Sequence, residues 1–419
     1  MHCTSTLLGL LLVTGLPSMA SAQAPIDTLR LADAIGQARS TNPGLRGTRL
    51  RADAASERVP QAGALPDPQL TFGLMNRPLN GFGTEEPMTM NQVQLSQMFP
   101  WPGKLGYSRE RARYLASAEA LSSAETEATL VSRVKLVYYE LASMDRAITI
   151  MERTRGLLRD FFQVSQTMYA VGEGLQQDVL RAQVAVAQMT EDLTVMNQRR
   201  VAMAARLNAL LGRDAGTPVG GLVLPAVGGA IASVDSLLAI ASEQRPALQA
   251  AHERTRAAAA GYQAARRELF PDIMVSLAYG QRPQFDDMGT LMIGLSLPLW
   301  SGSKQLPLRR EMAAMQAMEG AMAQDLYNDT FAELTEARAE AERARDLGTL
   351  YATAILPQAK ASVESALSAY RVGRVDYQTL VENEMTVNRY EIELVRIAAQ
   401  YHQAVARIDA LLGLMGGDR

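Results

Sequence analysis

The stretch Val93–Lys104, VQLSQMFPWPGK, decides the fold that this sequence predicts. Val93 and Leu95 alternate with polar neighbours, and Phe99 rejoins the apolar row after a slip, which is typical of a strand with one apolar face. The segment PWPG then ends the strand. No Gly or Pro occurs from residue 107 to residue 155, so a very long helix is expected to follow.

The same arrangement returns about 200 residues later in Ile293–Lys304, IGLSLPLWSGSK. Leucines alternate with small or polar residues up to Pro298, and Trp300 and Gly302 precede a second long helical segment. A half-polar strand that leads into a very long helix therefore occurs twice. A helix of about 65 residues spans about 100 Å, so such helices must pack side by side along an elongated body.

The two halves of the chain match along their length. Five landmarks recur in the same order, which indicates one large duplicated unit and not the short repeats of a solenoid. The pairs are Asn42–Leu45 with Arg245–Leu248, Leu65–Asp67 with Phe270–Asp272, the two strand-to-helix segments, Tyr169–Gly172 with Tyr370–Gly373, and Ala209–Gly212 with Ala410–Gly413. Gly156 and Pro357 add a matched weak point in each long helix.

Each half is expected to hold a short helix, a second helix, a strand hairpin and a long helix that turns back into a shorter one. The first repeat is placed at 23–212, with its hairpin at 69–99 and its long helix pair at 104–211. The second repeat is placed at 234–413, with its hairpin at 273–299 and its helix pair at 303–412. Residues 213–233, rich in Gly and Pro, form a linker, and 414–419 form a short tail.

Composition and the N-terminal segment narrow the class of protein. The chain has 419 residues, 5% aromatic content and a net charge of −3, which gives no basic surface for nucleic acid. Residues 1–22 hold a short apolar run followed by Ala20-Ser21-Ala22, the pattern of a cleaved export signal. Cys3 lies too early to carry a lipid anchor. Later windows offer no apolar run of about 18 residues, so any membrane span must be built from strands.

The sequence argues against an enzyme. Only His2, His252 and His402 are present, and the exported chain is expected to lack cysteine, which excludes Cys/His metal sites and a Cys nucleophile. No G-x-x-x-x-G-K-[ST] phosphate loop occurs, so the chain has no energy source of its own. We expect no cofactor and no resident metal.

Four strands are too few to cross a membrane alone. Membrane strands need about 9–11 residues each, and the smallest closed barrels have about eight strands. Because lipid tolerates no open sheet edge, several chains would have to share one barrel. The positions expected to face lipid are Ile273, Val275, Leu277, Tyr279, Leu291, Ile293, Leu295 and Leu297. Two soluble hairpins packed on helices remain the alternative.

Taken together, these residues resemble the TolC family of outer-membrane efflux channels. The resemblance covers nearly the whole exported chain and rests on the duplication, the Leu65–Pro68 and Phe270–Asp272 segments, the strand-to-Gly-Lys segments and the Tyr-x-Val-Gly turns. It implies a mainly α fold with a small β part. Four strands from each chain of a homotrimer would complete a twelve-stranded barrel in outer-membrane lipid. The long helices would form a tunnel (an α-barrel) in the periplasm, and a periplasmic adaptor and an inner-membrane pump would be the partners.

The resemblance also assigns roles to the turns between the long helices. Family members meet the adaptor through these tips, which here are Val171, Gly172, Glu173, Gly174, Leu175, Val372, Gly373, Arg374, Val375 and Asp376. The family closes its periplasmic end with hydrogen bonds and charges near the second turn. The candidates for that gate are Tyr370, Arg374, Asp376, Glu382 and Glu384, although the basic member is displaced and the acidic members do not match the pattern cleanly.

The cargo and the wider role are open at this stage. The segment Gln97–Lys104 is similar to the heavy-metal branch of the family, and Met75, Met88, Met90 and Met98 supply thioethers that suit soft ions such as Cu(I). Drugs or other small molecules are the alternative cargo. Two other functions share much of the pattern: a periplasmic coiled-coil scaffold or adaptor without a pore, and an exit duct for type I protein secretion.

Overall fold

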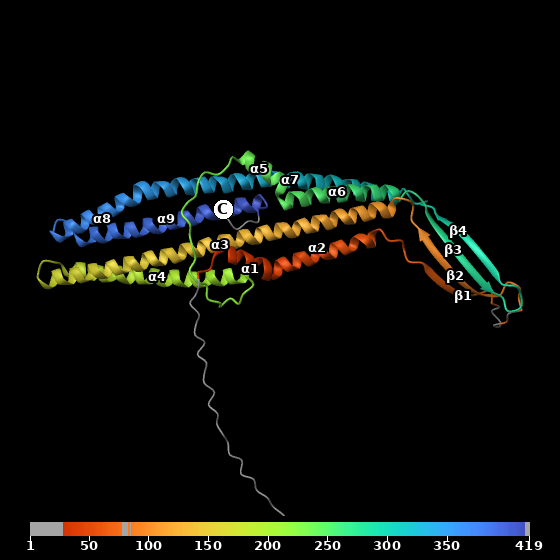
Figure 1. Ribbon diagram of the computed structural model, residues 1–419, viewed down its shortest axis with the longest axis horizontal. Coiled ribbons are helices and arrows are strands. Elements are labelled where there is room, and N and C mark those ends of the chain that lie inside the picture. Colours follow the sequence, from red (N-terminus) through yellow and green to blue (C-terminus); the bar gives the residue numbers. More distant parts are fainter. Residues whose placement is uncertain (1–27, 78–82, 84, 415–419) are drawn as a thin grey trace, which may run out of the picture.

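The computed structural model describes residues 28–77, 83 and 85–414. The expected export signal at 1–22 and part of the first hairpin loop lie outside the described residues. Figure 1 shows an elongated body of helices that run side by side, with a small sheet extending from one end. The fold is mainly helical with four strands, as the sequence predicts.

The two halves contain the same elements in the same order. The first half comprises α1 (Leu31–Thr41), α2 (Pro43–Ala62), β1 (Gln69–Met75), β2 (Met90–Phe99), α3 (Lys104–Ala170) and α4 (Gln176–Leu210). The second half comprises α5 (Val234–Gln244), α6 (Pro246–Arg267), β3 (Asp272–Gln281), β4 (Met288–Ser296), α7 (Gln305–Leu350), the π-helix η1 (Tyr351–Ile355), α8 (Leu356–Arg371) and α9 (Tyr377–Leu411). Proline opens the second helix of each half, where its missing N–H costs nothing.

The two long helical arms, α3 in the first half and α7–η1–α8 in the second, differ at the expected weak point. The 67-residue helix α3 passes through Gly156 without a break, so this part of the prediction is wrong. The second arm is interrupted by the five-residue π-helix η1, and Pro357 follows directly at the start of α8. Glycine keeps its backbone N–H, so it can still donate the hydrogen bond to the carbonyl four residues back in the helix. Proline lacks that N–H and clashes with the carbonyl four residues back, so the helix must rearrange around it.

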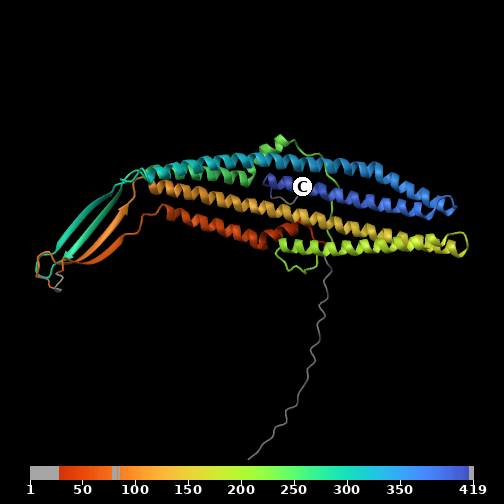
Figure 2. The same cartoon turned by 180° about the vertical axis from the view of Figure 1, so that it is seen from behind.

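The helices form a single curved layer. Figures 1 and 2 agree on the order α4–α3–α9–α8 toward one end and α2–α3–α6–α7 toward the sheet. Leu158 on α3, Met189 on α4 and Leu380 on α9 belong to one apolar core near the helical tips. A second core joins α1, α2, α3 and α4 around Leu45 and Leu141. Thus α3 and α9 are central, whereas α2, α4, α7 and α8 lie at the edges of the layer.

The sheet is antiparallel throughout, in the order β1-β2-β3-β4. The pairing of β2 with β3 is unbroken from Asn91 to Phe99. Phe99 therefore lies on the same face of the sheet as Val93 and Leu95, and the expected slip is absent. One face carries rows of large apolar residues, such as Leu70–Leu95–Leu277–Leu291. The opposite face carries small, polar and methionine residues. Strands β1 and β4 leave both edges of the sheet open.

The linker between the halves has no helix or strand, as expected, but it is held to the central helices. The Tyr401 hydroxyl donates to the Gly229 carbonyl at 2.9 Å, and the Val223 N–H donates to the Tyr138 hydroxyl at 3.2 Å. The linker therefore crosses α3 and α9 as a strap. Within the described part of the chain, no helix combines the length and apolar character needed to cross a membrane.

Candidate functional site

The two helical tips lie together at the end of the molecule farthest from the sheet (Figure 1). The first tip joins α3 to α4 through residues 171–175, and the second joins α8 to α9 through residues 372–376. Gly172 and Gly373 adopt φ values of +81° and +67°, which favour glycine. In both tips the next N–H donates back to a carbonyl in the last helical turn, Glu173 to Met168 at 2.9 Å and Arg374 to Ala369 at 2.9 Å.

Exposed apolar side chains mark these tips. Val171, Leu175 and Val372 are 63%, 65% and 68% exposed, respectively. Asp376 instead has a local role, because its carboxylate accepts the Thr379 N–H at 3.0 Å and caps α9. Hydrogen bonds from the Thr379 side chain and backbone lower the pKa of Asp376. Glu173 and Arg374 are also exposed, whereas Val375 is half-buried.

The gate candidates do not form one cluster within the chain. Arg374, Asp376 and Glu382 are exposed, whereas Glu384 is buried and Tyr370 is half-buried. Glu382 and Glu384 are two residues apart, so a helix of 3.6 residues per turn places them on opposite sides of α9. The exposed Glu382 accepts a hydrogen bond from Gln378 at 2.7 Å.

Two tyrosines pack together at the second tip, one at the end of α8 and one at the start of α9. Tyr370 packs edge-on against Tyr377 with ring centroids 5.9 Å apart, and Tyr377 is fully buried. Burial raises the pKa of both hydroxyls, and the carboxylate of Asp178 on α4 adds to that rise. Asp178 therefore lies beside the tyrosine pair. Asp178 also lies in the first turn of α4, where an acidic residue suits the start of a helix.

A second polar cluster lies deeper between the central helices. Burial raises the pKa of Glu384, an effect that Arg153 and Lys360 oppose and Glu391 reinforces. Glu391 is ion-paired with Arg153, and Lys360 Nζ lies 2.9 Å from its carboxylate. Periodicity did not reveal this cluster, because Glu384 and Glu391 occupy positions that an apolar stripe would occupy.

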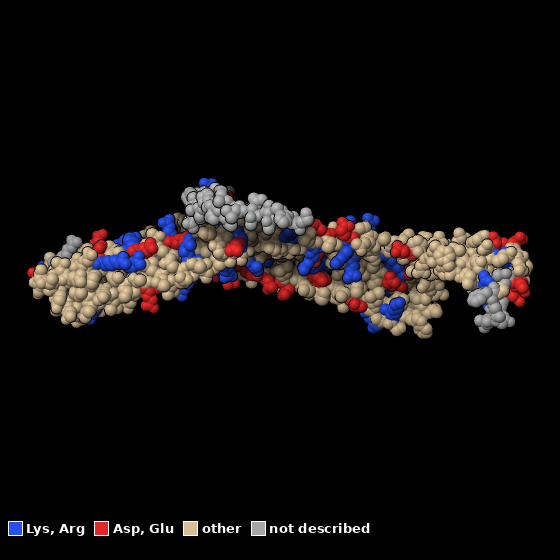
Figure 3. All heavy atoms as spheres, turned by 90° about the horizontal axis from the view of Figure 1, so that it is seen from below, with Lys and Arg blue, Asp and Glu red and all other residues tan. Residues whose placement is uncertain are grey.

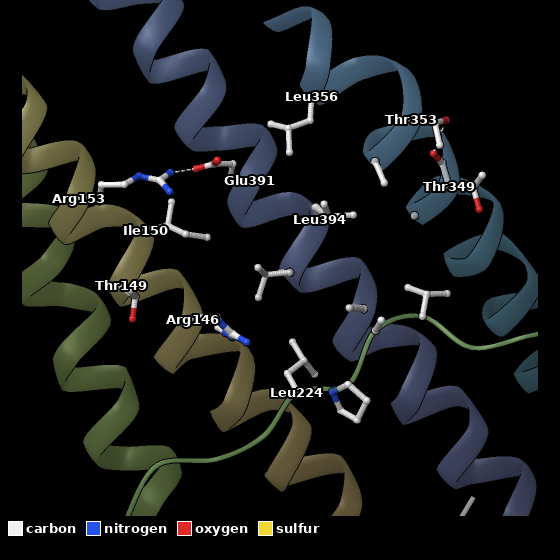
Figure 4. Close-up of a pocket in the computed structure, with 17 residues that line it drawn as sticks. Arg146, Thr149, Ile150, Arg153, Leu224, Thr349, Thr353, Leu356, Glu391 and Leu394 are labelled. Atoms are coloured by element: carbon white, nitrogen blue, oxygen red, sulfur yellow. Dashed lines mark hydrogen bonds and ion pairs between the residues drawn. The ribbon is translucent and has the colours of Figure 1, made fainter. Parts of the chain in front are cut away.

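A groove of about 860 Å³ opens next to this cluster (Figure 4). Arg146, Arg153 and Ile150 line it from α3, Glu391 and Leu394 from α9, and Leu356 from α8. The linker residues 224–227 close one end. Figure 4 shows Arg153 directed toward Glu391 across the groove. The linker strap and the central helices therefore enclose a partly apolar hollow with a charged rim.

The sheet has the two faces expected of a membrane pore wall. Asp272, at the base of β3, is the one charged residue in the four described strands. Figure 3 shows this flank free of charged side chains between a charged patch at the far end and the mixed charges of the helices. The apolar face contains Ile273, Val275, Leu277, Tyr279, Leu291, Ile293 and Leu295. The second hairpin ends earlier than expected, so Leu297 lies just beyond β4.

Six methionines share the opposite face of the sheet. Their rows follow from the register: Met75 opposes Met90, Met98 opposes Met274, Met288 opposes Gly280, and Met292 opposes Ser276. Met88 is not among them, because it precedes β2 in the hairpin loop. Within the described residues, His, Cys, Asp and Glu side chains form no group of three or more that could hold a metal.

The segment PWPGK joins the sheet to the helices and ends in a buried lysine. Lys104 is 7% exposed, and its Nζ lies 2.8 Å from Asp272 Oδ1 and 3.2 Å from Glu268 Oε2. The same Asp272 oxygen accepts the Trp101 N–H at 2.8 Å. Gly103 allows the sharp turn with a φ of +95°. The motif that decides the fold therefore ties the first half of the chain to the second.

Solved structures similar to this chain share its fold. The outer-membrane channel OprN matches with a TM-score of 0.79 and 17% identity over 91% of this chain and 89% of its own. The outer membrane protein VceC from Vibrio cholerae matches with a TM-score of 0.78 and 18% identity over 91% of this chain and 96% of its own. CusC, described in terms of folding and transmembrane channel formation, matches with a TM-score of 0.78 and 16% identity, covering 91% of both chains.

Sequence comparisons point the same way. Comparison with curated proteins gives no match. A family model described as outer membrane efflux protein matches residues 34–213 and 237–414, which is most of the chain and both of its halves. The chain therefore belongs to the outer membrane efflux protein family.

Proposed function

We propose that three copies of this chain form the outer-membrane channel of a tripartite efflux system. The channel would be a passive conduit, supplied by an inner-membrane pump through a periplasmic adaptor. The observation that carries this proposal is the sheet: four strands, three of them 9–10 residues long, with one apolar face, one polar face and two open edges. Such a sheet is unstable in lipid alone but completes a barrel with other copies.

The helical arms support the periplasmic part of the proposal. The 67 residues of α3 reach about 100 Å, far enough to extend from a membrane into the periplasm. A pore-free scaffold would share these arms but would have no use for a charge-free apolar flank on the sheet. A protein-secretion exit duct would share the whole chain and differ in its pump.

Membrane fractionation followed by native mass measurement in mild detergent tests the assembly. The expected result is recovery in the outer membrane at about three times the chain mass of 45.5 kDa. A soluble periplasmic monomer or dimer would overturn the channel and favour the scaffold. Ile293→Lys, on the apolar face, should cost about 2–4 kcal/mol at mid-bilayer depth and block insertion, whereas Thr290→Lys on the polar face should not.

The cargo proposed here is a soft metal ion such as Cu(I) or Ag(I). Thioether sulfur suits such ions, and the six methionines all belong to the face that would line the pore. Met98 and Met274 are direct cross-strand neighbours, so two sulfurs from adjacent strands lie at one level. Successive weak sites of this kind would let ions pass without trapping them.

A growth assay separates metals from drugs. Cells that depend on this channel and carry Met98→Leu with Met274→Leu should become several-fold more sensitive to silver or copper, with unchanged drug sensitivity. Met322→Leu, on the exposed side of α7, is the matched control and should change neither. Equal silver sensitivity in wild type and barrel variant would leave drugs or other small molecules as the cargo.

The two helical tips are proposed to contact the adaptor. Their support is the exposed apolar group of Val171, Leu175 and Val372, at the end of the molecule opposite the sheet. Val372→Asp should abolish recovery of the adaptor in pull-downs while leaving the channel assembled. Val201→Asp is the control, because Val201 is 61% exposed on α4 away from the tip. Equal recovery with both variants would place the contact elsewhere.

The resting gate is proposed to involve the tyrosine pair and not the whole set expected from sequence. Tyr377 belongs to the apolar core that also contains Ala182 and Ala185 of α4, and Tyr370 packs against that core, so the tyrosine pair would hold the two tips of a protomer together. Tyr370→Phe should keep this packing, and Tyr370→Ala should loosen it. Single-channel conductance in planar bilayers tests this: only the alanine variant should open more often.

A further inference from the structure

The two halves of the chain contain matched junctions between sheet and helices, and only one is closed. The first junction is defined as Pro100–Lys104 together with Glu268–Asp272. Here Trp101 stacks on Phe270 with ring centroids 5.2 Å apart and planes inclined by 11°. Lys104 is buried against Asp272 in the same contact. This junction joins the first half to the second inside one protomer.

The second junction is defined by the matching segments, Pro298–Lys304 and Gly63–Asp67, and its two sides lie apart. The first segment follows β4 at one edge of the layer, and the other precedes β1 at the opposite edge. Trp300 is 78% exposed and Leu65 is 50% exposed. In the described chain, Lys304 and Asp67 are also exposed, and neither has an oppositely charged side chain within 4.0 Å.

We propose that the second junction closes between two copies of the chain and reproduces the first. Trp300 of one copy would pack on Leu65–Pro66 of the next, and Lys304 would pair with Asp67 of that copy. Strand β4 would pair with β1 of the same neighbour. This inference rests on the proposed assembly of several copies, and it adds the contact surface and the strand register.

The register of this seam follows from the duplication. The first junction lies beside the β2–β3 pair, so the second should lie beside an equivalent β4–β1 pair. Pro100, which ends β2, matches Pro298 after β4, and Asp272, which opens β3, matches Asp67 before β1. With the strands aligned on these residues, the observed β2–β3 register pairs Leu295 with Leu70, Ile293 with Phe72 and Leu291 with Leu74 of the neighbouring copy. On the other face, Gly294 meets Thr71. This register matches apolar residues with apolar residues, and a one-residue slip would mix the two faces.

The charges agree with the same arrangement. In the first junction the five-residue segment PWPGK ends in Lys104, which meets the aspartate that opens the next hairpin. The second turn, PLWSGSK, also ends in lysine, and Asp67 stands at the position that matches Asp272. An exposed tryptophan, an unpaired lysine and an unpaired aspartate thus all find partners when two open edges meet.

Paired cysteines in a Cys3→Ser background test the seam. Thr71→Cys with Gly294→Cys should form a disulfide between chains, giving crosslinked dimers and trimers on denaturing gels. Thr71→Cys with Thr290→Cys is the control, because Thr290 lies four residues along the strand, beyond the 4.4–6.8 Å that a disulfide spans between Cα atoms. Ser96→Cys with Ser276→Cys is the matched pair within one chain, whose hydroxyls lie 3.0 Å apart, and should close without linking chains.

Native mass of each variant is measured in the same detergent extract. An assembled oligomer that crosslinks through Gly294 but not Thr290 supports the seam. An assembled oligomer that crosslinks through Thr290, or through neither position, overturns the register while the channel stands. A protein that remains monomeric in the membrane overturns both the seam and the proposed function.

Charge reversal provides a second readout. Lys304→Asp alone and Asp67→Lys alone should each lower the temperature at which the oligomer dissociates in detergent, and the double variant should restore most of the loss. Losses that simply add in the double variant would contradict the ion pair.

Discussion

The arms α3 and α7–η1–α8 descend from the same repeated unit but have different surroundings. Both span 67 residues, as their bounds show. Helix α3 is central and packs on α2, α4, α6 and α9, whereas its counterpart lies at an edge of the layer. The central arm is continuous, and the edge arm contains the π-helix and proline. A long helix packed on both sides is thus unbroken here, while an exposed one accommodates an interruption.

The largest effect is expected from a proline in the central arm. Gly156→Pro would remove one backbone hydrogen bond of α3 and clash with the preceding turn, which should cost about 3 kcal/mol or more. Denaturant unfolding in detergent, followed by circular dichroism at 222 nm, measures this. Gly156→Ala is the control and should stabilise the helix by up to about 1 kcal/mol, since nothing lies within 4 Å of an added methyl group.

The closed first junction gives the next largest effect. Lys104→Met would leave Asp272 and Glu268 without their cation, which should lower stability by about 1–3 kcal/mol, less than for fully buried pairs because both carboxylates are partly exposed. A double-mutant cycle with Asp272→Asn separates this coupling from lost packing. If the two losses are additive, the ion pair does not hold the junction together.

The matched helices α9 and α4 differ in one titratable position that should make stability depend on pH. Buried Glu384 on α9 matches Gln183 on α4, which is exposed. Because burial raises the folded pKa of Glu384 above its ordinary value of 4.5, the folded state holds the proton more tightly than the unfolded chain. This contribution to stability is largest at low pH and is lost as pH rises from about 4.5 through the folded pKa.

Glu384→Gln should therefore raise stability at neutral pH, by about 1 kcal/mol, and flatten this part of the pH profile. Thermal unfolding from pH 4 to pH 8 measures the difference between the two proteins. Gln183→Glu is the matched control at the exposed position and should leave the profile unchanged. A wild-type protein that gains stability as pH rises through this range would contradict the direction of the shift.

The smallest effect is expected at the interruption itself. Pro357→Ala would restore an N–H at the start of α8, where the π-helix already tolerates its absence, so global stability should change by no more than about 1 kcal/mol. Hydrogen exchange of residues 351–361 should slow as the ladder becomes more regular. Unchanged exchange would indicate that the packing of α8 on α9, and not the proline, fixes the π-helix.

The sequence predicts most of this architecture because its signals are local. The long stretch without Gly or Pro predicted α3, and the alternation in VQLSQMF predicted the two faces of the sheet. The duplication predicted the order of elements in both halves. These signals depend on chain stiffness and periodicity, which one strand or one helix already contains.

The candidate site was less predictable, since it depends on which helices become neighbours. Nothing local in the sequence distinguishes Glu384, buried beside α3, from Glu382 in solvent until α9 is placed. Asp178 acquires its role from two tyrosines about 200 residues away in sequence. The loss of Met88 and the gain of Met288 on the polar face of the sheet depend on where β2 and β4 begin, which the alternation within a strand does not fix.

The two open edges of the sheet have a genetic consequence. A chain with a damaged β1 edge but an intact β4 edge can still join a ring, yet it cannot let that ring close. If the channel is the proposed trimer, a cell that produces equal amounts of normal and damaged chain would assemble only about one trimer in eight entirely from normal chains. Such alleles should be dominant, whereas alleles that prevent folding should be recessive. Inheritance in mixed cells would thus distinguish defects of the seam from defects of the protomer.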